Sequence, residues 1–241
     1  LGGYSNSGLT GNKGATNYGG ADYWVIKVDA TGEKQWERSF GGAADDLLYA
    51  VVVTDDGGYA LAGYSSSDIS GNKTTASFGN NDVWLIKLDA GGNKVWEREY
   101  GGSGEDYVVY AIIQTSDGGF LLGASSDSPV SGNKELPNAG GERDWWILRL
   151  DRGGQKVWEK IYGSDANDCP YTVRELNGGY LIAGSNRAGG GNKTTPSILH
   201  DDGWIIKTDS NGDRVAEYCF GTWLDDDFWT SLLLPDGGFW L

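Results

Sequence analysis

Acidic residues recur at one place in the chain and are its first candidates for chemistry. An aspartate precedes each of four hydrophobic segments, and these residues are Asp46, Asp106, Asp168 and Asp227. If the segments line one channel, the four carboxylates converge at its mouth, and a Ca²⁺ ion on the axis would relieve their repulsion. The alternative is that each carboxylate is exposed to water or accepts backbone N–H groups in its own turn. The sequence leaves both open.

A second constellation recurs with the same period. The tripeptide Gly-Asn-Lys occurs four times, centred on Asn12, Asn72, Asn133 and Asn192. An aspartate then stands two residues before a tryptophan, in the pairs Asp22/Trp24, Asp82/Trp84, Asp144/Trp146 and Asp202/Trp204. Such an Asp can accept hydrogen bonds from the preceding loop, Asn suits the turn, and Lys can pair with the Asp. This favours a structural role. The alternative is a repeated ligand site, for which a carbohydrate fits the polar groups and aromatic faces.

Three tryptophans, Trp145, Trp223 and Trp229, fall outside the repeated positions. They are candidates for exposed ligand platforms, and packing within the core or between repeats is the alternative.

The sequence offers no catalytic constellation. A Ser-His-Asp set would have to use the single histidine, His200, which lies in a polar loop. The two cysteines, Cys169 and Cys219, form no CxxC motif, so we expect free thiols and no zinc site. A glycosidase needs two carboxylates, and nothing singles out two of the many acids. We therefore expect a non-catalytic protein, with a propeller hydrolase, lyase or quinoprotein-like enzyme as the alternative.

Composition limits the partners. The 241 residues carry a net charge of −15, which argues against nucleic acid and anionic membranes. No run approaches the length of a membrane-spanning helix, and the opening LGGYSNSG is not a secretory signal. The chain contains no methionine, and we interpret it as a processed or excised fragment.

The elements that must position these residues are short strands. The Gly-Asn-Lys triplets begin at residues 11, 71, 132 and 191, a period close to 60 residues. Each period contains hydrophobic segments rich in Val, Ile, Trp and Tyr, bounded by Gly, Asp, Asn or Ser. No stretch shows helical periodicity. The pattern predicts an all-β chain of four-stranded antiparallel sheets, and a radial array of such sheets is a β-propeller.

We predict a single domain over residues 1–241 with four blades. Their ranges are about 46–100, about 106–162, about 168–220, and about 227–241 together with 1–40. The last blade is shared because the tail DGGFWL joined to the head LGGYS recreates the segment DGGYALAGYS. This favours a ring closed by the two ends. The alternative is a part of an array with five or more blades.

The repeats resemble known families. Their order of strands, with DGG and a late Trp, is similar to Kelch-type blades. The stretches VDATGEKQW, LDAGGNKVW and LDRGGQKVW resemble the docking motif of quinoprotein-like propellers, in which the Trp packs between blades. That resemblance implies this role for Trp36, Trp96 and Trp158, whereas Ala216 stands at the fourth position and implies a different junction. The whole chain also resembles repeats of secreted surface proteins from gliding, type IX-secreting bacteria.

We therefore expect an extracellular or cell-surface binding or adhesion module for a glycan, a protein or a cation. We expect it to be a monomer or a part of a larger chain, and a structural spacer of an adhesin is a further alternative.

Overall fold

The chain is all-β, as predicted. The computed structural model describes residues 1–187, 189–197, 201–234 and 238–240, with only the backbone described for residues 108–110, 233, 239 and 240. Strands, turns and bends make up the described residues, and none of them forms a helix that could cross a membrane. His200 lies outside the described residues, as do residues 235–237 and 241 of the predicted shared blade.

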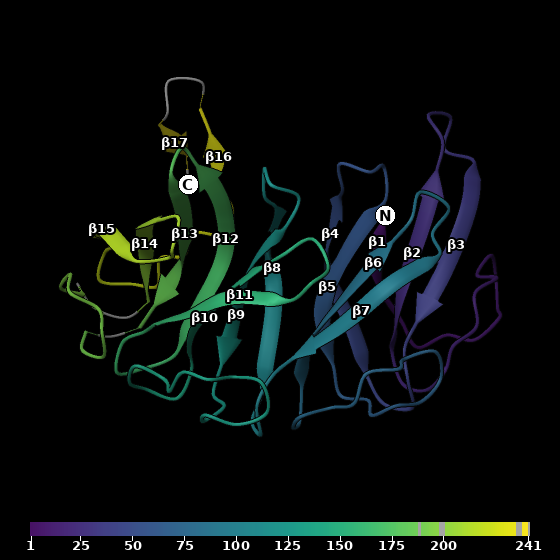
Figure 1. Ribbon diagram of the computed structural model, residues 1–241, viewed down its shortest axis with the longest axis horizontal. Helices are drawn as coiled ribbons and strands as arrows, with labels where there is room; N and C mark the ends of the chain where they lie inside the picture. The colour runs from purple at the N-terminus through teal and green to yellow at the C-terminus, as the bar shows by residue number, and fades with distance from the viewer. Residues whose placement is uncertain (188, 198–200, 235–237, 241) are drawn as a thin grey trace. The chain divides into compact units, whose positions relative to one another are not determined.

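The chain divides into two compact units. The first contains residues Leu1–Val108 and Ser131–Lys134, and the second contains Val109–Val130 and Glu135–Leu241. Every sheet is an antiparallel meander in which neighbouring strands follow one another along the chain (Figure 1).

The first unit holds two sheets. The three-stranded sheet consists of β1 (Gly2–Ser5), β2 (Asp22–Val28) and β3 (Lys34–Phe40). The four-stranded sheet consists of β4 (Asp46–Val53), β5 (Tyr59–Ser65), β6 (Asp82–Leu88) and β7 (Lys94–Tyr100).

The second unit repeats this pattern. One sheet is formed by β8 (Asp106–Gln114), which begins in the first unit, with β9 (Phe120–Ser126), β10 (Asp144–Leu150) and β11 (Lys156–Tyr162). The next is formed by β12 (Asp168–Leu176), β13 (Gly179–Asn186), β14 (Asp202–Asp209) and β15 (Arg214–Phe220). A short hairpin pairs β16 (Leu232–Leu233) with β17 (Phe239–Trp240).

The turn chemistry of the sequence explains the hairpins between third and fourth strands. In the turn after β6, Gly92 has a φ of 79°, which a glycine adopts without steric cost. The carboxylate of Asp89 accepts the backbone N–H of Asn93 and closes the same turn. The turns after β2 and β14 repeat both features, with Asp29 and Gly32 and with Asp209 and Gly212.

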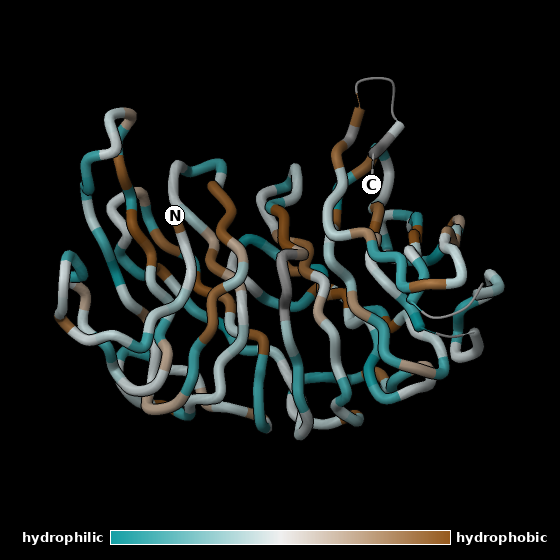
Figure 2. Tube along the Cα trace, turned by 180° about the vertical axis from the view of Figure 1, so that it is seen from behind, coloured by the Kyte–Doolittle hydropathy of each residue, from teal (hydrophilic) through white to brown (hydrophobic). Residues whose placement is uncertain are grey.

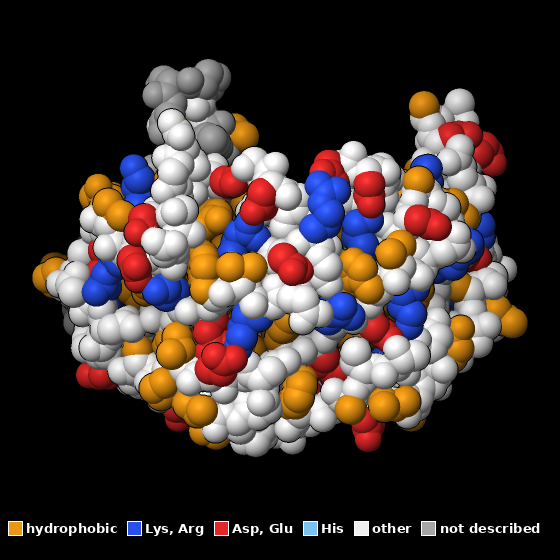
Figure 3. Space-filling model, viewed as in Figure 1, with side chains coloured by type: hydrophobic (Ala, Val, Ile, Leu, Met, Phe, Trp, Pro, Cys, Tyr) orange, Lys and Arg blue, Asp and Glu red, His pale blue; other side chains and the backbone are white. Residues whose placement is uncertain are grey.

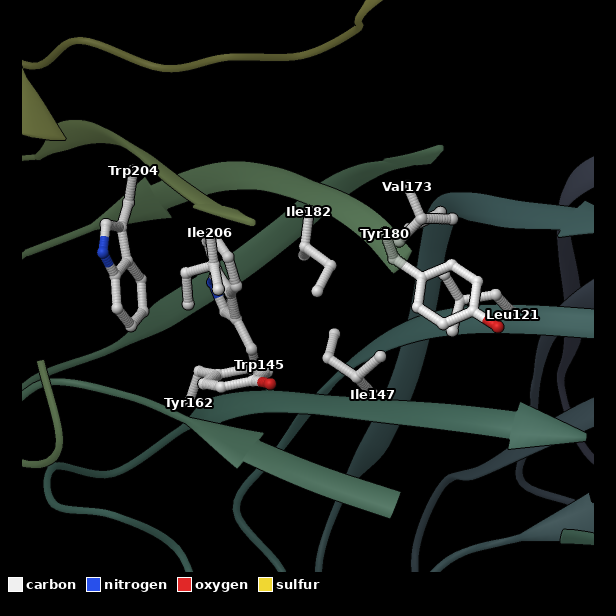
Figure 4. Packing of buried hydrophobic residues seen from close by; sticks show 10 residues of the cluster. Leu121, Trp145, Ile147, Tyr162, Val173, Tyr180, Ile182, Trp204 and Ile206 are labelled. Carbon is white, nitrogen blue, oxygen red and sulfur yellow. The ribbon is translucent and has the colours of Figure 1, made fainter. Parts of the chain in front are cut away.

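Hydrophobic residues concentrate on the strands, and hydrophilic residues on many of the loops (Figure 2). Within the second unit, sheets β8–β11 and β12–β15 share a core that includes Leu121, Trp145, Ile147, Trp204 and Ile206 (Figure 4). Within the first unit, Tyr23, Leu61, Trp84 and Ile86 belong to the corresponding core of sheets β1–β3 and β4–β7. Sheet-against-sheet packing therefore joins successive repeats inside each unit.

Candidate functional sites

The Asn of each later Gly-Asn-Lys loop is a clip between repeats. The side chain of Asn72 accepts the backbone N–H of Gly41 at 2.9 Å and donates to the carbonyl of Ser39 at 2.9 Å. Its own backbone N–H donates to the carbonyl of Gly41 at 3.0 Å. Asn133 repeats these contacts with Gly101 and Glu99, and Asn192 repeats them with Gly163 and Ile161. These three side-chain amides bind the end of the preceding sheet, so the prediction that they bind a ligand is wrong.

The Asn of the first loop differs from the other three. Asn12 is exposed, and its side chain forms no hydrogen bond with another described residue. Its backbone carbonyl accepts the ammonium of Lys34 at 2.9 Å. The clip of the first repeat is therefore open in this structure.

Removing an occupied clip should weaken the fold, whereas removing the open one should not. We expect Asn72→Ala to lower the free energy of unfolding by about 1–3 kcal/mol, because two buried backbone groups lose their partner. Asn12→Ala is the matched control and should leave stability unchanged within about 0.5 kcal/mol. Urea unfolding followed by far-UV circular dichroism measures both. Equal losses in the two variants would contradict the distinction between occupied and open clips.

A glutamate of the fourth strand holds the other side of each loop. Glu97 of β7 accepts the backbone N–H of Thr74 at 2.7 Å and the indole N–H of Trp84 at 3.1 Å. Glu217 of β15 does the same for Thr194 and Trp204. The loops are therefore fixed to their own sheet as well as to the preceding one.

The aspartates before the repeated tryptophans organise the same loops. Asp82 accepts the backbone N–H of Phe78 at 2.7 Å, and Asp22 accepts that of Tyr18 at 2.5 Å. Asp144 accepts the backbone N–H of Ala139 in the same way. All three carboxylates are fully buried, and this geometry agrees with the structural interpretation of the repeat.

The lysine of the loop has a partner that the sequence did not predict. Lys73 is fully buried, and its ammonium lies 2.6 Å from a carboxylate oxygen of Glu99 rather than pairing with an Asp. It also donates to the carbonyls of Ser67 and Thr75, each at 2.8 Å. Burial raises the pKa of Glu99 to about 8. In the last repeat, the ammonium of Lys193 instead lies 3.5 Å from the thiol of Cys219.

The carboxylates proposed as metal ligands bind backbone groups. Asp46 accepts the backbone N–H of Gly42 at 2.7 Å and the hydroxyl of Ser67 at 2.9 Å. Asp106 accepts the N–H of Gly102, and Asp168 accepts the N–H of Ser164 at 2.6 Å. These three aspartates are at most 1% exposed. No group of three His, Cys, Asp or Glu side chains among the described residues could hold a metal ion. The residues therefore do not fit a Ca²⁺ ion.

The predicted register slips by one residue at the fourth position. Asp226, rather than Asp227, accepts the backbone N–H of the residue four positions earlier, here Thr222. Its own N–H donates to Asp201, as the N–H of Asp46 donates to Ala21. Asp226 is therefore the repeat equivalent of Asp46.

Buried carboxylates meet in pairs beside the glycine that follows a fourth strand. A Cβ added at Gly41 would lie 1.9 Å from Asp22 Oδ1 and 3.0 Å from Asp46 Oδ2. Burial, together with the charge of Asp46, raises the pKa of Asp22 to about 6. Burial, together with the charge of Asp144, raises the pKa of Asp168 to about 7. Two adjacent buried carboxylates favour retention of a proton by one of them.

The three additional tryptophans have different environments. Trp145 is fully buried, donates to the carbonyl of Ser185 at 3.2 Å and packs 4.5 Å from Trp204. The prediction of an exposed platform at Trp145 is therefore wrong. Trp223 is 78% exposed and borders a hollow of about 540 Å³ with Leu224. Trp229 is 59% exposed and stacks on Tyr171, with 4.5 Å between the ring centroids.

A tyrosine cluster in the first unit was not predicted. Tyr4, Tyr49, Tyr64 and Tyr107 form a chain of ring contacts, with centroid distances of 6.3, 5.8 and 5.0 Å. The outermost ring, Tyr4, is 53% exposed. The tyrosines stand at non-equivalent positions of the repeat, so the repeat pattern gave no signal for this cluster.

Two of the docking tryptophans lie against the following sheet. Trp36 of β3 packs on Gly92, where an added Cβ would lie 3.1 Å from the indole, and meets Tyr59 edge-on. Trp158 of β11 packs on Gly212, and its indole N–H donates to the carbonyl of Ser210 at 3.3 Å. Trp96 occupies the same position in β7. Ala216 occupies it in β15.

Exposed charges are interspersed rather than segregated. Basic and acidic side chains alternate on the face shown in Figure 3. Some of them form exposed ion pairs, such as Lys160 with Asp213 at 2.6 Å. The excess of negative charge therefore forms no patch of a single sign on this face.

Comparison with known proteins gives limited information. No protein-family model matches the chain. The chain is similar to the "Regulatory protein FlaEY" of Caulobacter vibrioides, with 25% identity over 91% of the chain. It spans about a quarter of the length of that relative.

Proposed function

We propose that the chain is a non-catalytic β-propeller that binds a glycan outside the cell or at its surface. The paired segments at the chain ends support the propeller. Leu232 pairs with Trp240 as Val52 pairs with Ala60. Strands β1–β3 in turn repeat the arrangement of β5–β7. The end segments thus provide complementary strands of one repeat, which a closed ring would unite.

The observation that carries the binding function is the exposure of Trp229 above Tyr171. A planar ring held by a stacked neighbour loses little side-chain entropy when a sugar face packs on it. Trp223 provides a second exposed ring, next to a hollow. The loop amides and carboxylates described above are engaged within the fold, so the exposed aromatic rings remain as ligand surfaces.

A glycan array with the intact chain tests this function. We expect a retained glycan whose affinity falls about tenfold or more in Trp229→Ala or Trp223→Ala, because the stacking surface is lost. Trp145→Ala is the matched control, since this buried ring should affect stability and not the affinity of the folded protein. Absence of any retained glycan, or affinity unchanged in both exposed-ring variants, would refute the proposal.

A further inference from the structure

A pocket of about 420 Å³ lies on the three-stranded sheet of the first unit. Leu1, Trp24, Ile26 and Val28 line its apolar part, and Gly32 belongs to its hairpin side. Asn12, whose clip is open, lies at the same pocket.

The equivalent place on the next sheet is filled by an indole. The residues 60 positions further along are Trp84, Ile86, Leu88 and Gly92, and Trp36 packs against this group. The effect on exposure is large. Leu88 is fully buried whereas Val28 is 37% exposed, and Leu61 is fully buried whereas Leu1 is 82% exposed.

The second unit shows the same filling. Trp158 lies against Gly212, and its N–H donates to the carbonyl of Ser210. The equivalent carbonyl in the first repeat belongs to Ala30, in the hairpin that borders the pocket. A Cβ added at Gly32 would meet no described atom within 4 Å.

We propose that this pocket binds an indole ring, the group that occupies its two counterparts. The indole face packs on the apolar wall formed by Leu1, Ile26 and Val28. The indole N–H donates to the carbonyl of Ala30. The ring belongs either to a small molecule or to a tryptophan on an extended peptide. The last repeat of this chain carries Ala216 at the docking position, so ring closure would leave room for the ligand.

The test uses 3-methylindole and the peptide of residues 154–163, GQKVWEKIYG, in calorimetric titrations of the full chain. We expect saturable binding of at least one of them and a fall of about tenfold or more in Val28→Trp, which fills the pocket. Val95→Trp, at an exposed position of β7, is the matched control and should bind as the unmodified chain does.

The arms distinguish the two sources of the ring. Binding of 3-methylindole identifies a small molecule as sufficient, and binding of the peptide alone identifies a polypeptide. In the latter case, the peptide with Trp158→Ala should bind about tenfold more weakly. No binding of either probe, or full binding in Val28→Trp with its melting temperature unchanged, would overturn the proposal. Ala216→Trp tests ring closure separately, because a closed ring would bring this indole to the pocket and exclude the probe.

Discussion

Lys73→Met should lower the free energy of unfolding by about 3–5 kcal/mol, the usual cost of removing one partner of a buried ion pair. The lysine ammonium binds Glu99 at 2.6 Å and two loop carbonyls at 2.8 Å, and all three acceptors would lose it at once. The ammonium also lowers the pKa of Glu99 against the effect of burial, so this carboxyl should take up a proton in the variant. Urea unfolding at pH 7 measures the loss.

The chain itself provides the matched control for this pair. In the next repeat, Ile161 stands at the position of Glu99, and Lys134 at that of Lys73. Glu99→Ile should therefore cost less than Lys73→Met, because Lys73 keeps the carbonyls of Ser67 and Thr75. A larger loss in Glu99→Ile than in Lys73→Met would show that the loop carbonyls contribute little.

The strands were predictable because local chemistry specifies them. The hairpins around Gly32, Gly92 and Gly212 combine an Asp that closes the turn with a glycine at positive φ, and both are visible in the sequence. The period of 60 residues then locates the remaining strands. This information stays within one repeat, which explains why fold class was easier to predict than any site.

Contacts between repeats were not predictable in the same way. Asn72 and Asn12 occupy identical sequence contexts, yet one amide binds the end of the preceding sheet and the other is exposed. Trp145 precedes the repeated Trp146, and strand alternation turns it into the core shared with the next sheet. The slip from Asp227 to Asp226 arose because the last repeat lacks the marker residues that align the others.

Acidification from pH 8 to pH 5 should stabilise the protein. Asp168 has a pKa of about 7 in the folded chain and an ordinary value of 3.8, so the folded state binds more protons between these values. Its contribution is fully present below about pH 4 and is lost as the pH rises through about 7. At about 1.4 kcal/mol per unit of pKa, this single group accounts for up to about 4 kcal/mol. Asp22 and Glu99 act in the same direction, with pKa values of about 6 and 8.

Asp168→Asn should flatten this dependence, because an amide keeps an acceptor for the N–H of Ser164 without binding a proton. Melting temperatures recorded from pH 5 to pH 8 give the slope for each variant. Asp56→Asn is the control, since the pKa of Asp56 is lowered by Lys87 and its contribution is lost only as the pH falls below the ordinary range of a carboxyl. It should leave the slope between pH 5 and pH 8 unchanged. A melting temperature that rises with pH over this interval would show that the paired carboxylates are ionised in the folded protein.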